Sequence, residues 1–264
     1  MKMFDSHAHY DDDRFEGIRD ELIAEVHSLG VEKITNIGAS LSSSKDSLEL
    51  AKKFDFVYCT VGVHPSDAVE DMKNENWLTE LEEMYKSSDK AVAIGEIGLD
   101  YHYGKDEKEE QKVCFEAQMA LAEKLGAPVI IHDREAHEDT LNILAKYPSV
   151  KGVLHSFSGS FEMAKEVIKM GYYISINGVV TFNNAKKLVD ILCRFAELGE
   201  DAKKRILVET DCPYLTPVPF RGKTNRSDYI SYTSEKAAEC LGITAEEFCE
   251  LTYNNACRFY GIEG

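Results

Sequence analysis

Six side chains of the types that bind metal ions occur at five places where an apolar, strand-like run gives way to polar residues. They are His7 and His9 in FDSHAHY, Glu96 in AVAIGEIGLDY, His132 in PVIIHDRE, His155 in GVLHSFSG and Asp211 in ILVETDCPYL. A set of imidazoles and carboxylates is typical of a divalent first-row metal. Because all five runs end in the same chemistry, the sequence predicts that the ends of five strands converge on one site.

The number of these residues indicates how many metal ions they bind. A catalytic zinc ion usually has three protein ligands and a water molecule, so six protein ligands exceed the needs of one ion. Six ligands suit two divalent ions that share a bridging carboxylate. The sequence therefore predicts two divalent metal ions as cofactors. The softness of the ligands favours zinc, manganese, iron or cobalt without deciding between them.

The residues around His7, His9 and Glu96 support this interpretation. His7 and His9 are two residues apart, so on an extended segment both imidazoles point to the same side. Asp5 lies on that side and is expected to orient one of them. Glu96 stands in GEIGLDY between two glycines, which allow a close approach of the backbone. A carboxylate at the end of an apolar strand must be paired or bound to a metal, and a metal bridge fits Glu96 best.

The other candidates have neighbours that suit an anionic substrate. Arg134 follows His132 by two residues and can face the same cavity. His155 precedes SFSGS, a loop whose backbone suits contacts with a phosphate or an oxyanion. Glu209 precedes Asp211 by two residues, so both carboxylates are expected to face inward. One of them would act as ligand and proton acceptor, and the other would support it.

Apolar runs that suit strands alternate with helical patterns along the chain. The predicted strands are 2–6, 33–38, 56–63, 91–96, 127–132, 151–155, 172–176 and 205–210. The predicted helices are 15–29, 43–53, 76–86, 108–125, 135–146, 161–170 and 184–198, with further helices in 233–260. The strand runs are almost continuously apolar, which is typical of parallel strands that are buried on both faces.

Eight strand–helix units favour an α/β fold of the (β/α)8 TIM-barrel type with extra C-terminal helices, as one domain over residues 1–264. A doubly wound open sheet is the alternative. An open sheet would not bring the ends of the first, fourth, fifth, sixth and eighth strands to one point. A closed barrel does so at the carboxyl ends of its strands.

Composition and charge limit the classes of protein that fit. The chain has 264 residues, of which 44% are hydrophobic and 29% charged, as in a globular protein. It has no apolar run of the about 18 residues that span a bilayer, and its first residues lack the apolar stretch of a signal peptide. Seven scattered Cys without a CxxC pair favour reduced thiols and a cytoplasmic location. A net charge of −17 argues against a surface that coats nucleic acid, but it allows a nuclease that holds one or two phosphates locally.

Several segments, in order along the chain, resemble the TatD family of metal-dependent hydrolases. They are FDSHAHYDDDRF, VGVHPSDA, AIGEIGLDYH, QKVCFEAQMALAEKLGAPVIIHDREA, HSFSG, GYYISINGVVT, VETDCPYLTPVPFRGKTN and NNACRFYGI. The family has deoxyribonuclease activity and an amidohydrolase-like TIM barrel, so the resemblance implies that fold, a pair of divalent metals and the same six ligands. Magnesium or manganese is usual in assays of the family. The resemblance also implies that His64 faces the substrate phosphate and that Arg221 and Lys223 lie near the same cavity.

Two segments depart from the pattern of the family. The motif HPHD reads HPSD here, so Ser66 replaces a second His. The chain continues after its RGKTN motif as RSD, where the family often has a Pro. Neither departure touches a predicted ligand. Both fall where the substrate is expected, so they bear on substrate preference and not on catalysis.

The sequence and the resemblance together favour hydrolysis of DNA phosphodiester bonds, as a 3′–5′ exonuclease on short single-stranded ends. Asp211 would accept the proton of the metal-activated hydroxide, while Glu96 would bridge the metals. His64, Arg134, Arg221 and Lys223 would balance the charge of the phosphate. Two alternatives remain open, namely hydrolysis of ester or amide bonds, including the aminoacyl ester of tRNA, and metal or nucleic-acid binding without catalysis. No membrane and no obligate protein partner are expected. A DNase would also have aromatic residues for base stacking, for which the candidates are Tyr101, Tyr103, Phe157 and Phe220.

Overall fold

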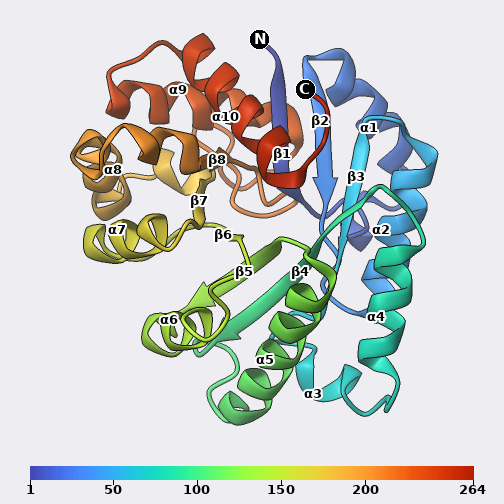
Figure 1. Cartoon of the computed structure of the whole chain (residues 1–264). Helices are drawn as coiled ribbons and strands as arrows, with labels where there is room; N and C mark the ends of the chain where they lie inside the picture. The colour runs from blue at the N-terminus through green and yellow to red at the C-terminus, as the bar shows by residue number, and fades with distance from the viewer.

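The computed structural model describes the backbone of residues 1–264 and every side chain except that of residue 200. In this part of the chain eight parallel strands form one sheet, and each strand pairs with the next in chain order. The strands are β1 (Met3–Ala8), β2 (Val31–Asn36), β3 (Val57–Val61), β4 (Ala91–Asp100), β5 (Val129–Arg134), β6 (Gly152–Leu154), β7 (Tyr173–Ile176) and β8 (Ile206–Val208). Figure 1 shows them arranged as a ring.

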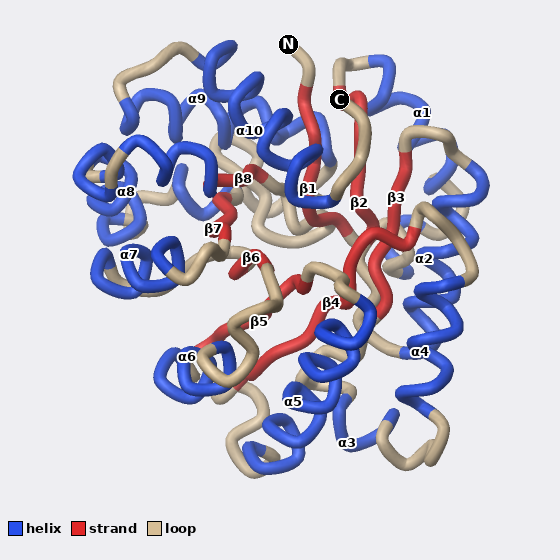
Figure 2. The backbone as a smooth tube through the Cα atoms, viewed as in Figure 1, coloured by secondary structure: helices blue, strands red, loops and turns tan.

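Helices connect the strands and lie on the outside of the ring (Figure 2). The α-helices are α1 (Arg19–Ser28), α2 (Leu41–Lys53), α3 (Ala68–Asp71), α4 (Trp77–Lys86), α5 (Lys108–Leu125), α6 (His137–Leu144), α7 (Phe161–Lys169), α8 (Lys186–Cys193), α9 (Ile230–Leu241) and α10 (Ala245–Tyr260). The 3-10 helices are η1 (Asp13–Phe15), η2 (Gly178–Thr181), η3 (Phe195–Leu198), η4 (Glu200–Arg205) and η5 (Ser227–Tyr229). Local capping fixes several starts, as at α10, where Thr244 and Glu247 form a reciprocal capping box.

The structure confirms the predicted (β/α)8 barrel with extra C-terminal helices. Each of the eight predicted strands overlaps an observed one, and the helix predicted at 108–125 coincides with α5. The helix predicted at 184–198 divides into α8 and η3, and the segment 233–260 contains most of α9 and α10. No helix in the described part of the chain combines the length and apolar character needed to cross a membrane.

The predicted fourth and fifth strands are too short at their carboxyl ends. The predicted fourth and fifth strands end at Glu96 and His132, whereas β4 continues to Asp100 and β5 to Arg134. The additional residues pair in parallel, with Gly98 opposite His132. Gly98 and Asp100 interrupt the apolar run after Glu96, but pairing with β5 keeps this segment extended. Glu96 and His132 are therefore held inside the sheet and not on loops.

The ring closes between β8 and β1 through a short seam. Ala8 and Cys212 form a single parallel bridge there. The backbone N–H of His9 donates to the carbonyl of Cys212 at 2.8 Å, and the N–H of Asp211 donates to the carbonyl of His7 at 2.9 Å. The seam thus fixes the first two histidines against Asp211 by backbone hydrogen bonds.

The C-terminal helix α10 packs across the amino-end face of the ring, away from the predicted ligands, and contacts β1 and β8. The rings of Phe4 and Tyr260 stack at 5.8 Å, and those of Tyr173 and Phe259 lie 5.0 Å apart. The hydroxyl of Tyr260 donates to the carbonyl of Ser6 at 2.6 Å. The amino-end face of the barrel is therefore closed by aromatic packing, and the carboxyl-end face is left for chemistry.

The close approach of β4 to β5 requires glycine at position 98. A Cβ on Gly98 would lie 2.0 Å from the carbonyl oxygen of His132, and its φ is +136°. We expect Gly98→Ala to lower Tm by at least about 5 °C relative to Gly17→Ala, because only Gly98 adds a backbone collision to the strain of positive φ. Gly17 has φ +76° and open space around its Cβ. Equal melting curves for the two variants, followed by circular dichroism, would contradict this account.

Candidate metal centre

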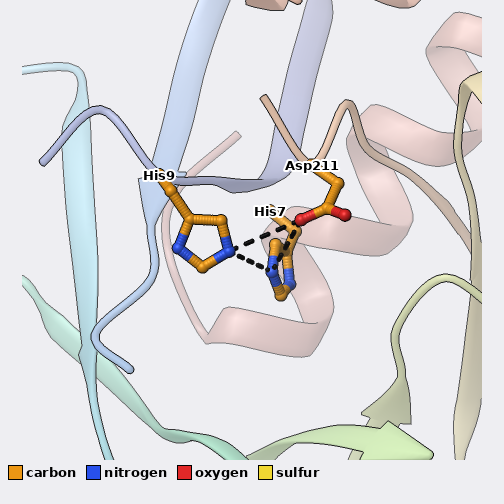
Figure 3. Close-up of side chains that lie close together, drawn as sticks. All are labelled: His7, His9 and Asp211. Carbon is orange, nitrogen blue, oxygen red and sulfur yellow. Dashed lines mark hydrogen bonds and ion pairs between the residues drawn. The ribbon is translucent and has the colours of Figure 1, made fainter. Parts of the chain in front are cut away.

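The seam between β8 and β1 brings together the first group of ligand candidates. Figure 3 shows His7, His9 and Asp211 with their donor atoms turned toward one another. The Nε2 atoms of the two histidines are 3.1 Å apart. Asp211 Oδ1 lies 3.6 Å from Nε2 of His7 and 3.4 Å from Nε2 of His9. Asp211 follows β8 with φ +57°, a left-handed conformation that turns the chain at the strand end.

Glu96, His132 and His155 form a second group beside the first. Glu96 Oε1 lies 2.9 Å from Nδ1 of His132 and 2.7 Å from Nε2 of His155. These two imidazole nitrogens are 3.1 Å from each other. All six predicted ligands are therefore brought together, from β1, β4, β5 and the segments after β1, β6 and β8.

Glu96 connects the two groups. Its second oxygen, Oε2, is 3.5 Å from Nε2 of His7 and 3.8 Å from Nε2 of His9. Burial alone would raise the pKa of this carboxyl, but the surrounding imidazoles, His155 foremost, hold it well below its usual value. Glu96 is therefore a carboxylate that can contact a cation on either side.

The donor set fits divalent cations. Pairs of imidazole nitrogens face each other at 3.1 Å, at His7–His9 and at His132–His155. Lone pairs in that arrangement repel each other unless a proton or a cation lies between them. The donors His7, Glu96 and His155 are buried. The donor atoms lie within 4.8 Å of one another in each of three sets, which are His7–His9–Asp211, His7–Glu96–His155 and His64–Glu96–His132. Divalent cations among these donors would relieve this repulsion in both groups.

The ligand imidazoles are oriented by groups behind them. Nε2 of His132 donates to Asp100 Oδ2 at 3.2 Å, which leaves Nδ1 to face Glu96. Nδ1 of His9 donates to the carbonyl of Ile37 at 3.2 Å, which leaves Nε2 as the donor atom. Such contacts fix the tautomer and angle of a ligand. Asp100 is not among the residues predicted from the sequence, although its position four residues after Glu96 puts both on one face of an extended strand.

Glu209 supports His155 from the interior of the barrel. Its Oε1 lies 3.4 Å from Nδ1 of His155. The same carboxylate accepts hydrogen bonds from the N–H of Ser156 at 2.8 Å and from the hydroxyl of Ser175. Glu209 is fully buried. The sequence predicted that one of the two carboxylates, Glu209 or Asp211, is a ligand and that the other supports it. The structure gives Glu209 the supporting place and puts Asp211 among the donors.

Asp5 does not orient a ligand imidazole, contrary to the expectation from its spacing. Its carboxylate accepts the N–H of Thr210 at 2.9 Å, the hydroxyl of Thr210 at 2.5 Å and the hydroxyl of Ser227 at 2.6 Å. Its contact with His7 is to the backbone N–H, at 3.4 Å. Burial raises the pKa of Asp5 to about 7. Asp5 therefore fixes the backbone next to Asp211 by cross-linking the strand end to the segment at Ser227.

His64 lies beside the second group, with Nε2 3.8 Å from Glu96 Oε1. The N–H of Ser66 donates to its Nδ1 at 3.1 Å, and the Ser66 hydroxyl lies 2.7 Å from the same atom. Because a backbone N–H can only donate, Nδ1 is the acceptor and Nε2 carries the proton of the neutral ring. Burial, followed by the neighbouring His132, lowers the pKa of His64 to about 3. Ser66, the departure from the HPHD motif, thus contacts His64 directly.

A cavity of about 1000 Å³ opens over the donors, and five of the six predicted ligands line it. Its other lining residues include the carboxylates Asp11, Asp12, Asp67, Asp100, Glu107 and Asp133. Arg134 also lines it, with its guanidinium 4.6 Å from the ring centre of Tyr103. Among the described side chains that line this cavity, Arg134 is the one Lys or Arg. The walls are therefore acidic, with one cation beside His132.

Arg221 and Lys223 lie outside the lining of this cavity. Both are exposed on the segment 214–226, whose first residues, Tyr214 and Leu215, do line it. The guanidinium of Arg221 lies 4.0 Å from the ring centre of Phe182. The ammonium of Lys223 lies 5.4 Å from the ring centre of Phe220. The resemblance implied that the two cations lie near the cavity. They are not among its lining residues, and the segment that carries them folds back on itself, since the side-chain amide of Asn225 donates to the carbonyl of Tyr214 at 2.7 Å.

The predicted stacking candidates differ in their surroundings. Tyr103 is exposed and lines the cavity, whereas Phe157 is buried in the hydrophobic core. Tyr101 is buried, and its hydroxyl donates to Asp139 at 2.6 Å. Phe220 stacks on Tyr229 with ring centres 4.3 Å apart. Of these four rings, Tyr103 alone is exposed in the cavity.

We expect Asp100→Asn to weaken binding of one metal ion by about 10–100-fold, because His132 loses the carboxylate that orients it. The asparagine can present its own NH2 to His132 and favour the wrong tautomer. Metal titration of the variant by isothermal calorimetry checks this. The matched control is Asp133→Asn on the next strand, which lines the same cavity and contacts His137 and not a ligand. Unchanged metal affinity in Asp100→Asn would refute the role of Asp100.

The barrel and its converging imidazole and carboxylate donors define a metal-dependent hydrolase. The chain belongs to the TatD-related DNase family, because the model of that family, described as "TatD related DNase", matches residues 4–261. It is 41% identical to the uncharacterized metal-dependent hydrolase YabD of Bacillus subtilis, over 98% of this chain and 99% of YabD. It is 34% identical to the uncharacterized metal-dependent hydrolase YcfH of Escherichia coli K12, over 100% of this chain and 97% of YcfH.

A solved structure agrees with the same assignment. The crystal structure of YJJV, a TatD homologue from Escherichia coli K12, superposes with a TM-score of 0.90 and 26% identity. The superposition covers 99% of this chain and 98% of YJJV. The resemblance inferred from the sequence motifs is thus confirmed for the family and for the fold.

Proposed function

We propose that the protein is a two-metal phosphodiesterase that degrades single-stranded DNA from its 3′ end. The position of Glu96 between the two donor groups carries this proposal. His7, His9 and Asp211 would hold one divalent cation, and His132 and His155 would hold the other. Glu96 would present one oxygen to each, since its Oε1 is within 2.9 Å of the second group and its Oε2 within 3.8 Å of the first.

Each side chain around the metal centre has a separate task in hydrolysis. Divalent cations, when held by these donors, would polarise a phosphoryl oxygen and lower the pKa of a bound water toward neutrality. The Asp211 carboxylate, which is 14% exposed at the cavity floor, accepts the proton of the attacking water. The Nε2–H of His64 points to the same space and donates to the phosphate. Arg134 neutralises part of the charge that develops there.

The acidic walls limit how much of a DNA strand can be bound. Carboxylates such as Asp11, Asp67 and Glu107 would repel phosphates that are not held by the cations or by Arg134. A strand end fits these walls better than a long duplex. The strand would leave along the segment 214–226, toward Arg221, Lys223 and the Phe220 ring. This path supports an exonuclease that contacts only a few nucleotides.

We expect the double variant Arg221→Gln/Lys223→Gln to raise KM for single-stranded DNA several-fold with kcat little changed, the pattern of lost ground-state binding. The slope of log Kd against log salt should fall by about 1.4, at about 0.7 per phosphate on single strands. Steady-state kinetics at several salt concentrations check this. The matched control is Lys52→Gln/Lys73→Gln, which removes the same charge elsewhere on the surface. Kinetics of the first variant identical to those of the control would place the phosphate contacts elsewhere.

Hydrolysis of an ester or amide that carries a positive charge is the second candidate, and the acidic cavity favours it. The same centre would attack a carbonyl carbon, and wall carboxylates would pair with an ammonium group such as that of an aminoacyl ester. A screen of the metal-reconstituted protein decides between the two candidates. It should compare single-stranded DNA with aminoacyl esters and with uncharged esters. Faster turnover of DNA supports the first candidate, and faster turnover of the ammonium esters supports the second.

We also propose a cytoplasmic location. All seven cysteines are free, and five of them are buried. Burial raises the pKa of Cys59 to about 12, which keeps this thiol protonated and unreactive. Unpaired thiols in this number are typical of a reducing compartment.

A further inference from the structure

A second cavity, of about 720 Å³, lies at the other end of the barrel from the metal centre. It lies at the amino ends of β7 and β8. The carboxyl ends of these strands are followed by Asn177 and by Glu209, which is next to the predicted metal ligand His155. Helices α7 and α10 and the 3-10 segments η3 and η4 supply its walls. Its lining residues are Lys165, Ile168, Lys169, Tyr173, Leu198, Asp201, Ala202, Lys204, Arg205 and Arg258.

This cavity is cationic in a protein that is strongly acidic. Five of its ten lining residues are Lys or Arg, whereas Lys and Arg account for 30 of the 264 residues of the chain. Asp201 is the one acidic residue among them, and it pairs with Lys204 at 2.9 Å. Among the described side chains, Lys165, Lys169, Arg205 and Arg258 have no ion-pair partner, because Asp201 pairs with Lys204. Four positive charges without a paired carboxylate therefore surround this cavity.

The floor of the cavity favours phosphate groups over bases. Tyr173 is only 5% exposed, and Phe259 and Arg205 cover its ring at 5.0 Å and 4.9 Å. No ring in the lining is thus free to stack on a base. The Arg205 guanidinium is fixed by donating to the carbonyl of Gly171 at 2.7 Å. Its remaining N–H groups form a preorganised fork of the kind that binds phosphate oxygens.

We propose that this cavity binds an oligophosphate, through the phosphate chain that inorganic triphosphate and nucleoside triphosphates share. Several adjacent cations match a ligand with several adjacent negative charges better than they match a single phosphate. Elsewhere the net charge of −17 repels such anions, so binding depends on this local cluster. The site is separate from the metal centre and does not depend on what the metal centre hydrolyses.

Calorimetric titration of the metal-loaded, full-length protein with inorganic triphosphate tests the proposal. We expect Lys165→Gln/Lys169→Gln to weaken binding of triphosphate at this cavity about tenfold. The affinity of the unchanged protein for triphosphate should fall with added salt. The control is again Lys52→Gln/Lys73→Gln, which has the same change in charge and should bind as the unchanged protein does. Triphosphate that binds at the metal centre would give a second set of binding sites in the titration, and that set should be unchanged in both variants. Equal affinities for all three proteins would overturn the proposal.

Chemical acetylation provides a readout of position. Bound triphosphate should protect Lys165 and Lys169 from acetylation and leave Lys52 and Lys73 unprotected. ATP should protect them at a similar concentration if the phosphate chain is the part recognised, and at a lower concentration if the nucleoside adds contacts. Absence of protection at saturating triphosphate would place the anion elsewhere and refute the site. DNA hydrolysis by the Lys165→Gln/Lys169→Gln variant should equal that of the unchanged protein.

Discussion

Replacing Glu96 by Gln is expected to reduce kcat about 10³-fold and to lower bound metal from two equivalents toward one. The neutral amide keeps the shape of the side chain but cannot present a negative oxygen to each donor group. A loss of about 4 kcal/mol of charge stabilisation in the transition state corresponds to that factor. Elemental analysis of the metal-reconstituted variant, with steady-state kinetics on the same sample, measures both effects.

Glu107→Gln is the matched control for this change. Glu107 lines the same cavity at the start of α5 and makes no contact with the six donors. We expect it to retain two equivalents of metal and nearly full activity. Two equivalents and intact turnover in Glu96→Gln would show that this carboxylate is not shared by two cations.

Replacing Asp211 by Asn is expected to reduce kcat by about 10²–10⁴-fold, the usual contribution of a general base, with a smaller change in KM. The amide oxygen can still coordinate, so metal content should fall less than in Glu96→Gln. Hydrogen bonding from His9 and the nearby imidazoles lower the pKa of Asp211 in spite of its burial, so the native side chain enters the reaction ionised. The two variants therefore separate proton transfer from metal retention.

Asp12→Asn tests whether any carboxylate of the cavity has this effect. Asp12 lines the cavity but pairs with Arg14 at 3.0 Å and accepts the hydroxyl of Tyr214 at 2.9 Å. We expect its kcat to stay within a few-fold of the unchanged protein. A similar loss of kcat in both variants would mean that the general charge of the cavity matters and that Asp211 has no special role as base.

The fold could be predicted because buried parallel strands have a plain signature. Runs such as 127–132 are almost entirely apolar, which is typical of parallel strands buried on both faces. The six donors could be predicted for a related reason. Polar residues such as His155 and Asp211 stand out when they directly follow such a run. Because the sheet closes into a ring, the ends of these separate strands lie close together and the six donors form one site.

The parts that were missed depend on geometry that local sequence does not contain. Asp100 lies beyond the predicted fourth strand, which ends at Glu96. The pairing of Gly98 with His132 that extends the strand involves residues more than 30 positions apart. Likewise the motif around Arg221 does not reveal that Arg221 and Lys223 lie outside the lining of the cavity. Contacts between distant segments decide both points.

Degradation of 5′-labelled single-stranded DNA by the metal-reconstituted protein tests the central claim most directly. The account predicts a ladder of strands that shorten one nucleotide at a time from the 3′ end, in the presence of a divalent metal. The ladder should be absent after chelation and in Glu96→Gln, and present in Glu107→Gln. The contradicting result would be DNA that stays full-length when magnesium, manganese, zinc and cobalt are each tried, while the same protein hydrolyses an ester or amide under the same conditions.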